Sequence, residues 1–262
     1  ADKGDIFEIW YLPSSLSDHR RPWGYATSAA GYHGDKPELG RIEFEGSTQN
    51  NIVGMHGRGS EAGEPNYYNV FKDPRDPDPQ RRYKAQGEMH GPGGHVPPGG
   101  MVNAYPPDGL HWIYNNKAVV MYPTNVADAN SVLGWDHRRQ KYVGYFRPGH
   151  PLAPEIDNIG QHRHIRTVGS AESDDFEAWT DTRMMLAQAA RDRVDHQYQS
   201  FTAGIFGEFY PGFRTLQQRH QQVCDVFLTS PRAGCHLNGG HLITPFCAPR
   251  RYGLLRTVPV IV

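Results

Sequence analysis

The sequence predicts an all-β protein, specifically a five-bladed β-propeller of four-stranded antiparallel blades. Two observations predict this fold. Short runs rich in aromatic and β-branched residues recur along the chain, and separate motifs repeat about every 60 residues. Units of four short strands cannot bury their faces alone and close radially, so we expect 1–262 to form one propeller domain. The 29 glycines and 21 prolines disfavour a long helical bundle.

The expected strands are bounded by clusters of Gly, Pro, Asn or Asp, which terminate strands and form turns. Helical periodicity occurs only at 182–193, where Met184, Met185, Leu186 and Ala189 share one face. Segment 90–100, rich in glycine and proline, predicts an inserted loop. The strands are expected at 7–11, 41–44, 67–71, 141–147, 201–206 and 225–229.

One repeated motif has the form S-x-D-G-x-x-W. Its best copies are 106–112 and 173–180, and worn copies are 28–34 and 230–236. The Asp-Gly pair favours a tight hairpin turn, after which the tryptophan packs under the next strand. Because these copies fall one blade apart, the motif marks the same turn in successive blades.

A second motif runs in phase with the first. Segments 73–84 and 136–142 are polar turns that deliver a basic residue and a tyrosine, Tyr83 or Tyr142, into the following strand. Two independent motifs with one period indicate a repeated supersecondary unit.

A third pattern, acid-x-amide before an apolar strand, carries the predicted chemistry. It occurs at 64–66, 128–130 and 195–197, and places Glu64, Asp128 and Asp195 at one point of the repeat. The first strand of each propeller blade lines the central channel, where ligands bind at the mouth. We therefore expect the three carboxylates to converge there. The alternative is that they are solvated residues of strand-initiating turns.

Three carboxylates around a small cavity suit glycoside hydrolysis, in which one stays ionised and another is kept protonated as the acid. Asp128 is predicted as the fixed carboxylate, Asp195 or Glu64 as the base, and Glu208 or Glu64 as the acid. Glu208 lies in 204–210, the expected turn between the first and second strands of its blade, from which it would reach the channel mouth. The alternative is a solvated glutamate at a hairpin tip. Substrate-binding side chains are predicted at Asn66, Asn130, His164, Arg166, His196 and Gln197.

Two other functions remain open. A polysaccharide lyase would use His164, Arg166, His196 and Tyr198 to abstract a proton beside a uronate carboxylate. A lectin-like propeller would bind glycan without turnover. No G-x-S-x-G elbow, P-loop or dinucleotide fingerprint is present, which argues against a serine hydrolase, an NTPase and a Rossmann enzyme.

The charge balance bears on partners and cofactors. A net charge of −1 and a pI near 7.0 give no basic footprint, so neither nucleic acid nor a membrane surface is an expected partner. No H-E-x-x-H spacing indicates a catalytic zinc. We expect no required cofactor, with a structural calcium ion among the converging carboxylates left open. The expected partner is a carbohydrate substrate.

The three cysteines, Cys224, Cys235 and Cys247, form no C-x-x-C pair and do not decide the redox compartment. A start at Ala1 is compatible with processing, so a secreted or periplasmic protein is expected and a cytoplasmic one left open. The oligomeric state is not predicted.

At these repeats the chain resembles the five-bladed β-propeller glycosidase-like superfamily of arabinanases, β-xylosidases, invertases and levanases. The resemblance implies a glycan-processing enzyme with axial acids at Glu64, Asp128 and Asp195. The matching stretches are 25–28, 36–40, 50–53, 70–73, 82–84, 107–112, 136–147 and 173–180.

The chain departs from the superfamily in two respects. The Trp-Met-Asn-Asp-Pro segment and the Glu-Cys pair of invertases are absent. Segment 7–11 corresponds to a later strand of the first blade, whose first strand is missing or supplied by 254–262.

Overall fold

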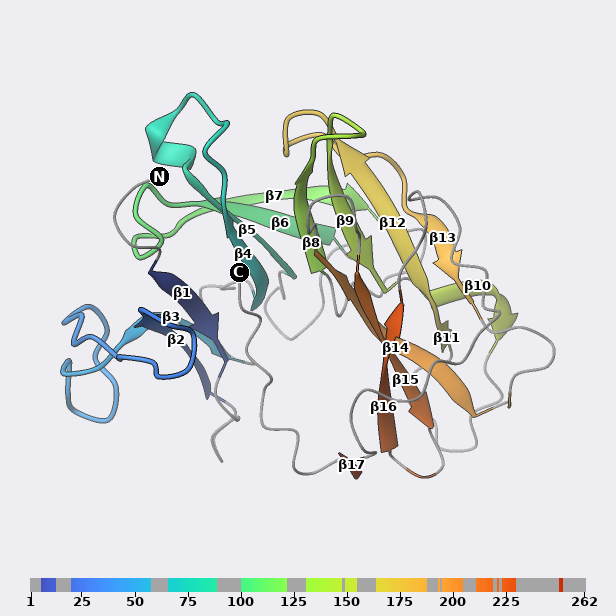
Figure 1. The fold of residues 1–262 in the computed structure, drawn as a ribbon, viewed down its shortest axis with the longest axis horizontal. Helices are drawn as coiled ribbons and strands as arrows, with labels where there is room; N and C mark the ends of the chain where they lie inside the picture. Colours follow the sequence, from blue (N-terminus) through green and yellow to red (C-terminus); the bar gives the residue numbers. More distant parts are fainter. Residues whose placement is uncertain are drawn as a thin grey trace. The chain divides into compact units, whose positions relative to one another are not determined.

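The structure is a computed structural model in which the described regular elements are β-strands and one 3-10 turn, Pro79–Arg81. The chain divides into two compact units (Figure 1), of residues 1–95, 103–116 and 256–262, and of residues 96–102 and 117–255. In the described part no helix is long and apolar enough to cross a membrane. The described residues are 6–12, 20–57, 66–88, 100–121, 131–147, 149–154, 164–187, 193, 195–204, 211–218, 221, 223–229 and 250–251.

Two sheets come first along the chain. One has the order β1-β2-β3 and the other the order β4-β5-β6-β7. Their strands are β1 (Phe7–Tyr11), β2 (Arg20–Ser28), β3 (Ile52–Gly57), β4 (Asn66–Lys72), β5 (Tyr83–Glu88), β6 (Gly100–Tyr105) and β7 (Ile113–Met121).

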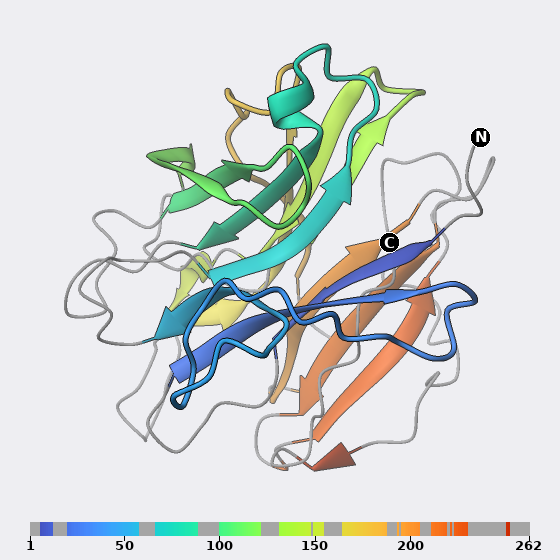
Figure 2. The same ribbon diagram turned by 90° about the vertical axis from the view of Figure 1, so that its left-hand side faces the viewer.

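Three further sheets follow, with the orders β13-β12-β9-β8, β10-β11 and β14-β15-β16-β17. Figure 2 shows β14, β15 and β16 side by side in orange. Their strands are β8 (Ser131–Asp136), β9 (Lys141–Phe146), β10 (Gly149–Pro154), β11 (His164–Arg166), β12 (Val168–Ser173), β13 (Arg183–Leu186), β14 (His196–Ala203), β15 (Gly212–Gln218), β16 (Val223–Thr229) and β17 (Arg250–Arg251).

The four-stranded sheets have the build expected of blades. In each of the three that the described residues form, the strands follow one another from the edge in chain order, and the first strand, β4, β8 or β14, is an edge strand. The hairpin β10-β11 lies between β9 and β12 in the chain and forms a separate two-stranded sheet. The all-β prediction is confirmed, whereas closure into one five-bladed ring stays a prediction. The expected closing strand, 254–262, and the loop at 90–99 lie outside the described residues.

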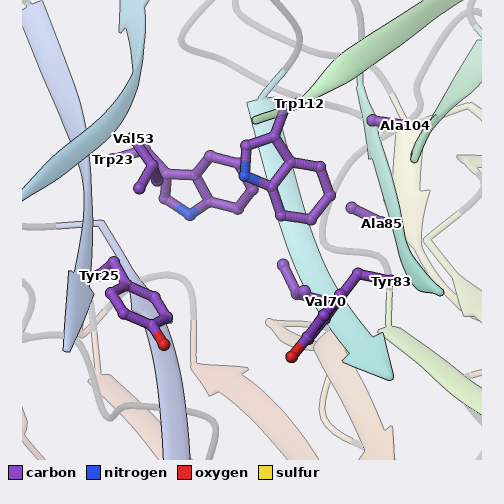
Figure 3. Close-up of a cluster of buried hydrophobic side chains, with 8 residues drawn as sticks. All are labelled: Trp23, Tyr25, Val53, Val70, Tyr83, Ala85, Ala104 and Trp112. Carbon is purple, nitrogen blue, oxygen red and sulfur yellow. The ribbon is translucent and has the colours of Figure 1, made fainter. Parts of the chain in front are cut away.

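An aromatic core joins the first two sheets (Figure 3). Trp23 of the first sheet packs against Trp112, which directly precedes β7, with ring centroids 4.9 Å apart and planes tilted by 44°. The ring centroids of Trp10 and Tyr25 are 5.3 Å apart. Each large side chain buried here contributes about 1.5–3 kcal/mol through apolar area removed from water. The core consists of Trp23, Tyr25, Val53, Val70, Tyr83, Ala85, Ala104 and Trp112.

Glu8 of β1 accepts a hydrogen bond at each carboxylate oxygen, one from the Tyr25 hydroxyl and one from the Tyr83 hydroxyl, both at 2.8 Å. The two tyrosines come from different sheets and are both buried. Burial raises the pKa of both hydroxyls, and the hydrogen bonds to Glu8 raise it further. The carboxylate therefore links the two sheets through neutral tyrosines.

Replacing Glu8 by glutamine is expected to lower the free energy of unfolding by about 1–3 kcal/mol, because one buried hydroxyl loses its acceptor. Since the folded state holds the tyrosine protons above their ordinary pKa, stability falls as pH rises past about 10. Denaturant unfolding across that range, with tyrosinate absorbance, measures both effects. Glu43→Gln, at an exposed position, is the control. A Glu8→Gln protein as stable as Glu43→Gln would contradict this account.

The first repeated motif forms the same turn in both good copies. Asp108 accepts from the main-chain N–H groups of Leu110 and His111 at 2.9 and 2.8 Å, and Asp175 likewise accepts from 177 and 178 at 2.8 Å. The following residue has positive φ in each, 75° at Gly109 and 68° at Phe176. Phe176 is fully buried and contacts Tyr142 at 5.3 Å, so packing stabilises a conformation unusual for phenylalanine.

The worn copy at 28–34 retains this geometry without the aspartate. Ser28 accepts from the main-chain N–H of Gly31 at 2.9 Å, as Ser173 does from Phe176, and Gly31 has a φ of 76°. The predicted recurrence is confirmed for three copies, and the copy at 230–236 lies outside the described residues.

The second motif is also confirmed as a turn between the first two strands of a sheet. Asp73 and Asp136 are buried, and each accepts a main-chain N–H two residues later, at 3.1 and 2.9 Å. Asp73 also accepts from Nζ of the fully buried Lys84 at 2.8 Å, which Asp76 contacts at the same distance.

Two expectations are wrong. The helix expected at 182–193 is absent from the described part, where Arg183–Leu186 form β13 and pair with β12. Sheet pairing here outweighs the helical spacing of Met185 and Ala189. Segment 41–44 is not a strand, because Glu45 and Gly46 adopt positive φ and only Phe44 makes an isolated bridge, with Ser47.

Candidate functional site

The acid-x-amide pattern coincides with the starts of three edge strands. Asn66 is the first residue of β4, Ser131 the first of β8, and His196 the first of β14. In each of these three sheets the acid of the pattern precedes the first strand by one to three residues. Glu64, Asp128, Asn130 and Glu208 lie outside the described residues, and for Asn66 and His164 only the strand position is described.

Asp195 is the described member of the predicted acid set. It directly precedes β14, and its side chain is only 5% exposed. One carboxylate oxygen, Oδ1, accepts from Nε of Arg193 at 3.2 Å. The other, Oδ2, is buried and has no hydrogen-bond partner among the described residues. A buried carboxylate oxygen without a partner costs free energy, so it favours a ligand or water that donates to it.

The charge on Asp195 is stabilised despite its burial. Burial alone raises the pKa of this carboxyl, but the hydrogen bond and positive charge of Arg193 outweigh it, with smaller contributions from a main-chain N–H and from His196. The net pKa lies below the ordinary aspartate value. Asp195 is therefore ionised at neutral pH, the form that a base, nucleophile or electrostatic stabiliser requires and a general acid does not.

Two residues of β14 that were predicted to bind substrate, His196 and Gln197, directly follow this carboxylate in the chain. His196 is half-buried, and its main-chain N–H donates to the carbonyl of Arg193 at 3.0 Å. Gln197 is buried and directly opposite Gln217 of β15 in the sheet register. Tyr198, by contrast, packs in the core of this unit with Phe201. That placement disfavours Tyr198 as the proton-transferring group of a lyase.

A β-bulge recurs in all three first strands, and the sequence gives no sign of it. The register shifts at Tyr68 in β4, at Leu133 in β8 and at Gln199 in β14. Bulges re-aim side chains and are frequent beside active sites. In β14 the bulge places the Gln199 side chain where Arg166 reaches it, with Nη1 to Oε1 at 2.5 Å.

Arg166, a predicted substrate-binding residue, belongs to a polar cluster with three residues that were not predicted. Its Nη1 also donates to the side-chain oxygen of Gln217. Arg147, which is buried, donates from Nη1 to the main-chain oxygen of Gln199 at 3.1 Å. Arg147, Gln199 and Gln217 were missed because they belong to no repeated motif and meet only through strand pairing and the bulge.

No group of three metal-ligating side chains occurs among the described residues. The predicted calcium site rests on Glu64 and Asp128 with Asp195, so it stays a prediction. What the described arrangement offers is an ionised carboxylate beside neutral amides and two guanidinium groups, a set suited to polyhydroxylated or anionic ligands.

No protein-family model matches the chain, and neither does any curated protein. Solved structures do. An N-acetylgalactosamine deacetylase from F. plautii, in complex with blood group B trisaccharide, has 9% identity and a TM-score of 0.52 over 90% of this chain and 70% of its own. A structure described as a glycoside hydrolase has 12% identity and a TM-score of 0.50 over 88% and 72%.

A third match is the β-fructofuranosidase of Schwanniomyces occidentalis complexed with fructosyl-erythritol, with 12% identity and a TM-score of 0.53. It covers 94% of this chain, which spans 44% of that enzyme's length. At such identities the likeness shows the fold alone. The all-β fold of this chain is therefore similar to the folds of these structures.

Proposed function

We propose that the protein is a glycoside hydrolase that acts on an oligo- or polysaccharide through carboxylates at the starts of its first strands. The observation that carries this proposal is Asp195, a buried, ionised carboxylate with one oxygen unpartnered in the described part, at the start of an edge strand. Two of the similar structures are glycosidases by description, and two contain bound carbohydrate, which supports a sugar ligand.

The lowered pKa assigns Asp195 the ionised role, as a base that activates water or as a nucleophile at the anomeric carbon. The proton for the leaving oxygen then comes from a different carboxyl, Glu208 or Glu64, with Asp128 as the fixed carboxylate. Gln197 and His196 would orient sugar hydroxyls, together with Asn66, Asn130 and His164. Arg166 completes the proposed substrate-binding set.

A panel of aryl glycosides and polysaccharides tests the proposal. Release of aryl alcohol or of new reducing ends is expected, without an unsaturated product. An unsaturated sugar would indicate the lyase alternative, and acetate release alone would indicate deacetylation, the chemistry named for one similar structure. Glycan binding without any turnover would indicate a lectin-like protein.

Removal of the Arg193 charge is expected to change the pH profile. Because Arg193 lowers the pKa of Asp195 against the effect of burial, Arg193→Gln raises that pKa. The acidic limb of kcat/KM then moves to higher pH, since Asp195 takes up its proton sooner. Arg183→Gln, on the exposed side of β13, is the matched control and leaves the limb in place. An unmoved limb in Arg193→Gln would exclude Asp195 as the group that sets it.

A further inference from the structure

Arg166 is held by neutral oxygens and not by a carboxylate. Its Nη1 donates to the side-chain oxygens of Gln199 and Gln217, which come from adjacent strands. In the described part these are its hydrogen bonds, and no ion pair is formed. An amide oxygen orients a guanidinium group but does not neutralise it. The full positive charge of Arg166 therefore remains.

Several other arginines in the described part are paired with acids. Arg139 contacts Glu172 at 2.7 Å, and Arg193 contacts Asp195 at 3.2 Å. Arg166 is half-buried like Arg139, yet its Nη2 and Nε groups donate to no described residue. A partly desolvated cation without a counter-ion is costly, so this position favours an anion from outside the described chain.

A second arginine, Arg147, also contacts Gln199. The buried Arg147 donates to the main-chain oxygen of Gln199, the residue whose side chain holds Arg166. Gln199 thus accepts from two guanidinium groups, from Arg147 at its main-chain oxygen and from Arg166 at its side-chain oxygen. The positive charges of both arginines would attract an anionic ligand bound at Arg166.

The cationic cluster lies beside the proposed catalytic carboxylate. Gln217, which holds Arg166, is directly opposite Gln197 in the register. Asp195 precedes Gln197 by two residues, a span of about 7 Å along a strand. A sugar whose scissile bond meets Asp195 would therefore place a neighbouring ring or substituent within reach of Arg166.

We propose that Arg166 forms a subsite for the carboxylate of a uronic acid residue in the glycan. This inference rests on the proposed carbohydrate function and specifies its substrate class. The planar guanidinium fork matches a carboxylate, and Nη2 and Nε are the two donors left to make the pair. Gln199 and Gln217 act as positioning residues, because they fix the plane of the guanidinium group without competing for those donors.

Binding, measured by titration calorimetry, tests the proposal without requiring turnover. The probes are oligosaccharides of galacturonic, glucuronic and mannuronic acid, each paired with its neutral methyl ester, and a sulfated galactan oligosaccharide. The wild-type protein is expected to bind at least one acid form about tenfold to a hundredfold more tightly than its ester. Arg166→Gln is expected to abolish this discrimination, so that each acid and its ester bind with similar affinity, whereas Arg183→Gln retains it.

Several results would overturn the subsite. These are equal affinity for every acid and its ester, preference for the sulfated probe over all uronates, or discrimination that persists in Arg166→Gln. Because the comparison of acid with ester uses wild-type protein, it holds even if a variant does not fold. Uronate discrimination without hydrolysis of any substrate would support the subsite and refute the hydrolase, and hydrolysis without discrimination would do the reverse.

Discussion

Asp195→Asn is expected to lower kcat/KM on the best substrate about 100-fold to 10,000-fold, with little change in folding. The substitution keeps the shape of the side chain and its acceptor for Arg193, but removes the charge that acts on the reacting centre. Losing an ionised base or nucleophile costs the most where the site is desolvated, and Asp195 is 5% exposed.

Asp225→Asn is the matched control for that variant. Asp225 is a buried carboxylate in the same sheet, and it accepts from Nε2 of Gln218 at 2.8 Å. It is in the third strand and not at the start of the first, so turnover is expected to stay near the wild-type value. Equal losses in both variants, or no loss in Asp195→Asn, would remove Asp195 from the site.

The largest expected effect on stability comes from Lys84→Met. Lys84 is fully buried, and its Nζ contacts Asp73 and Asp76 at 2.8 Å, with Asp73 only 2% exposed on its side chain. Removing the cation leaves two carboxylates together, one of them inside the protein. Breaking a buried ion pair from one side costs about 3–5 kcal/mol, and we expect a loss of that size in denaturant unfolding.

Lys141→Met separates burial from charge pairing. Lys141, which precedes Tyr142 as Arg82 precedes Tyr83, contacts Asp174 at 2.6 Å, but the two side chains are 36% and 77% exposed. Its loss is expected to cost less than about 1 kcal/mol. The double variant Lys84→Met/Asp73→Asn should recover part of the stability lost by Lys84→Met. No recovery would mean that the uncompensated Asp73 charge is not the cause.

The ion pair between Lys84 and Asp76 also affects how the free energy of unfolding changes at acidic pH. Burial raises the pKa of Asp76, but the hydrogen bond from Lys84, together with a main-chain N–H and nearby positive charges, lowers it below the ordinary value. This stabilisation is present above the unfolded-state pKa and is lost as pH falls through the lower folded-state pKa.

Local turn chemistry was predictable from the sequence because the responsible atoms lie within a few residues of each other. Asp108 and Asp175 accept from main-chain N–H groups two and three residues ahead. Asp73 and Asp136 accept from a main-chain N–H two residues ahead, after the first strand of their sheets. The acid-x-amide pattern was also informative, because it marks strand starts that recur with the sheets. The turn motifs and the acid-x-amide pattern together predict the all-β fold and the position of Asp195 just before a first strand.

The polar cluster around Arg166 was only partly predictable. Gln199 and Gln217 approach Arg166 because of a bulge and of strand pairing between segments far apart in the chain. A bulge has no fixed sequence pattern, since it depends on how the neighbouring strand registers. Phe176 is a similar case: its positive φ breaks the local preference for glycine, and burial against Tyr142 compensates.

Under the proposed function, acidic residues at the starts of different first strands act together on one glycosidic bond. The most direct test compares kcat of Asp128→Asn, Asp195→Asn and the double variant. The effects on kcat of two carboxylates that stabilise the same transition state do not multiply. The kcat of the double variant is therefore expected to be at most about tenfold lower than that of the less active single variant. Losses that multiply, or full activity in either single variant, would contradict the claim.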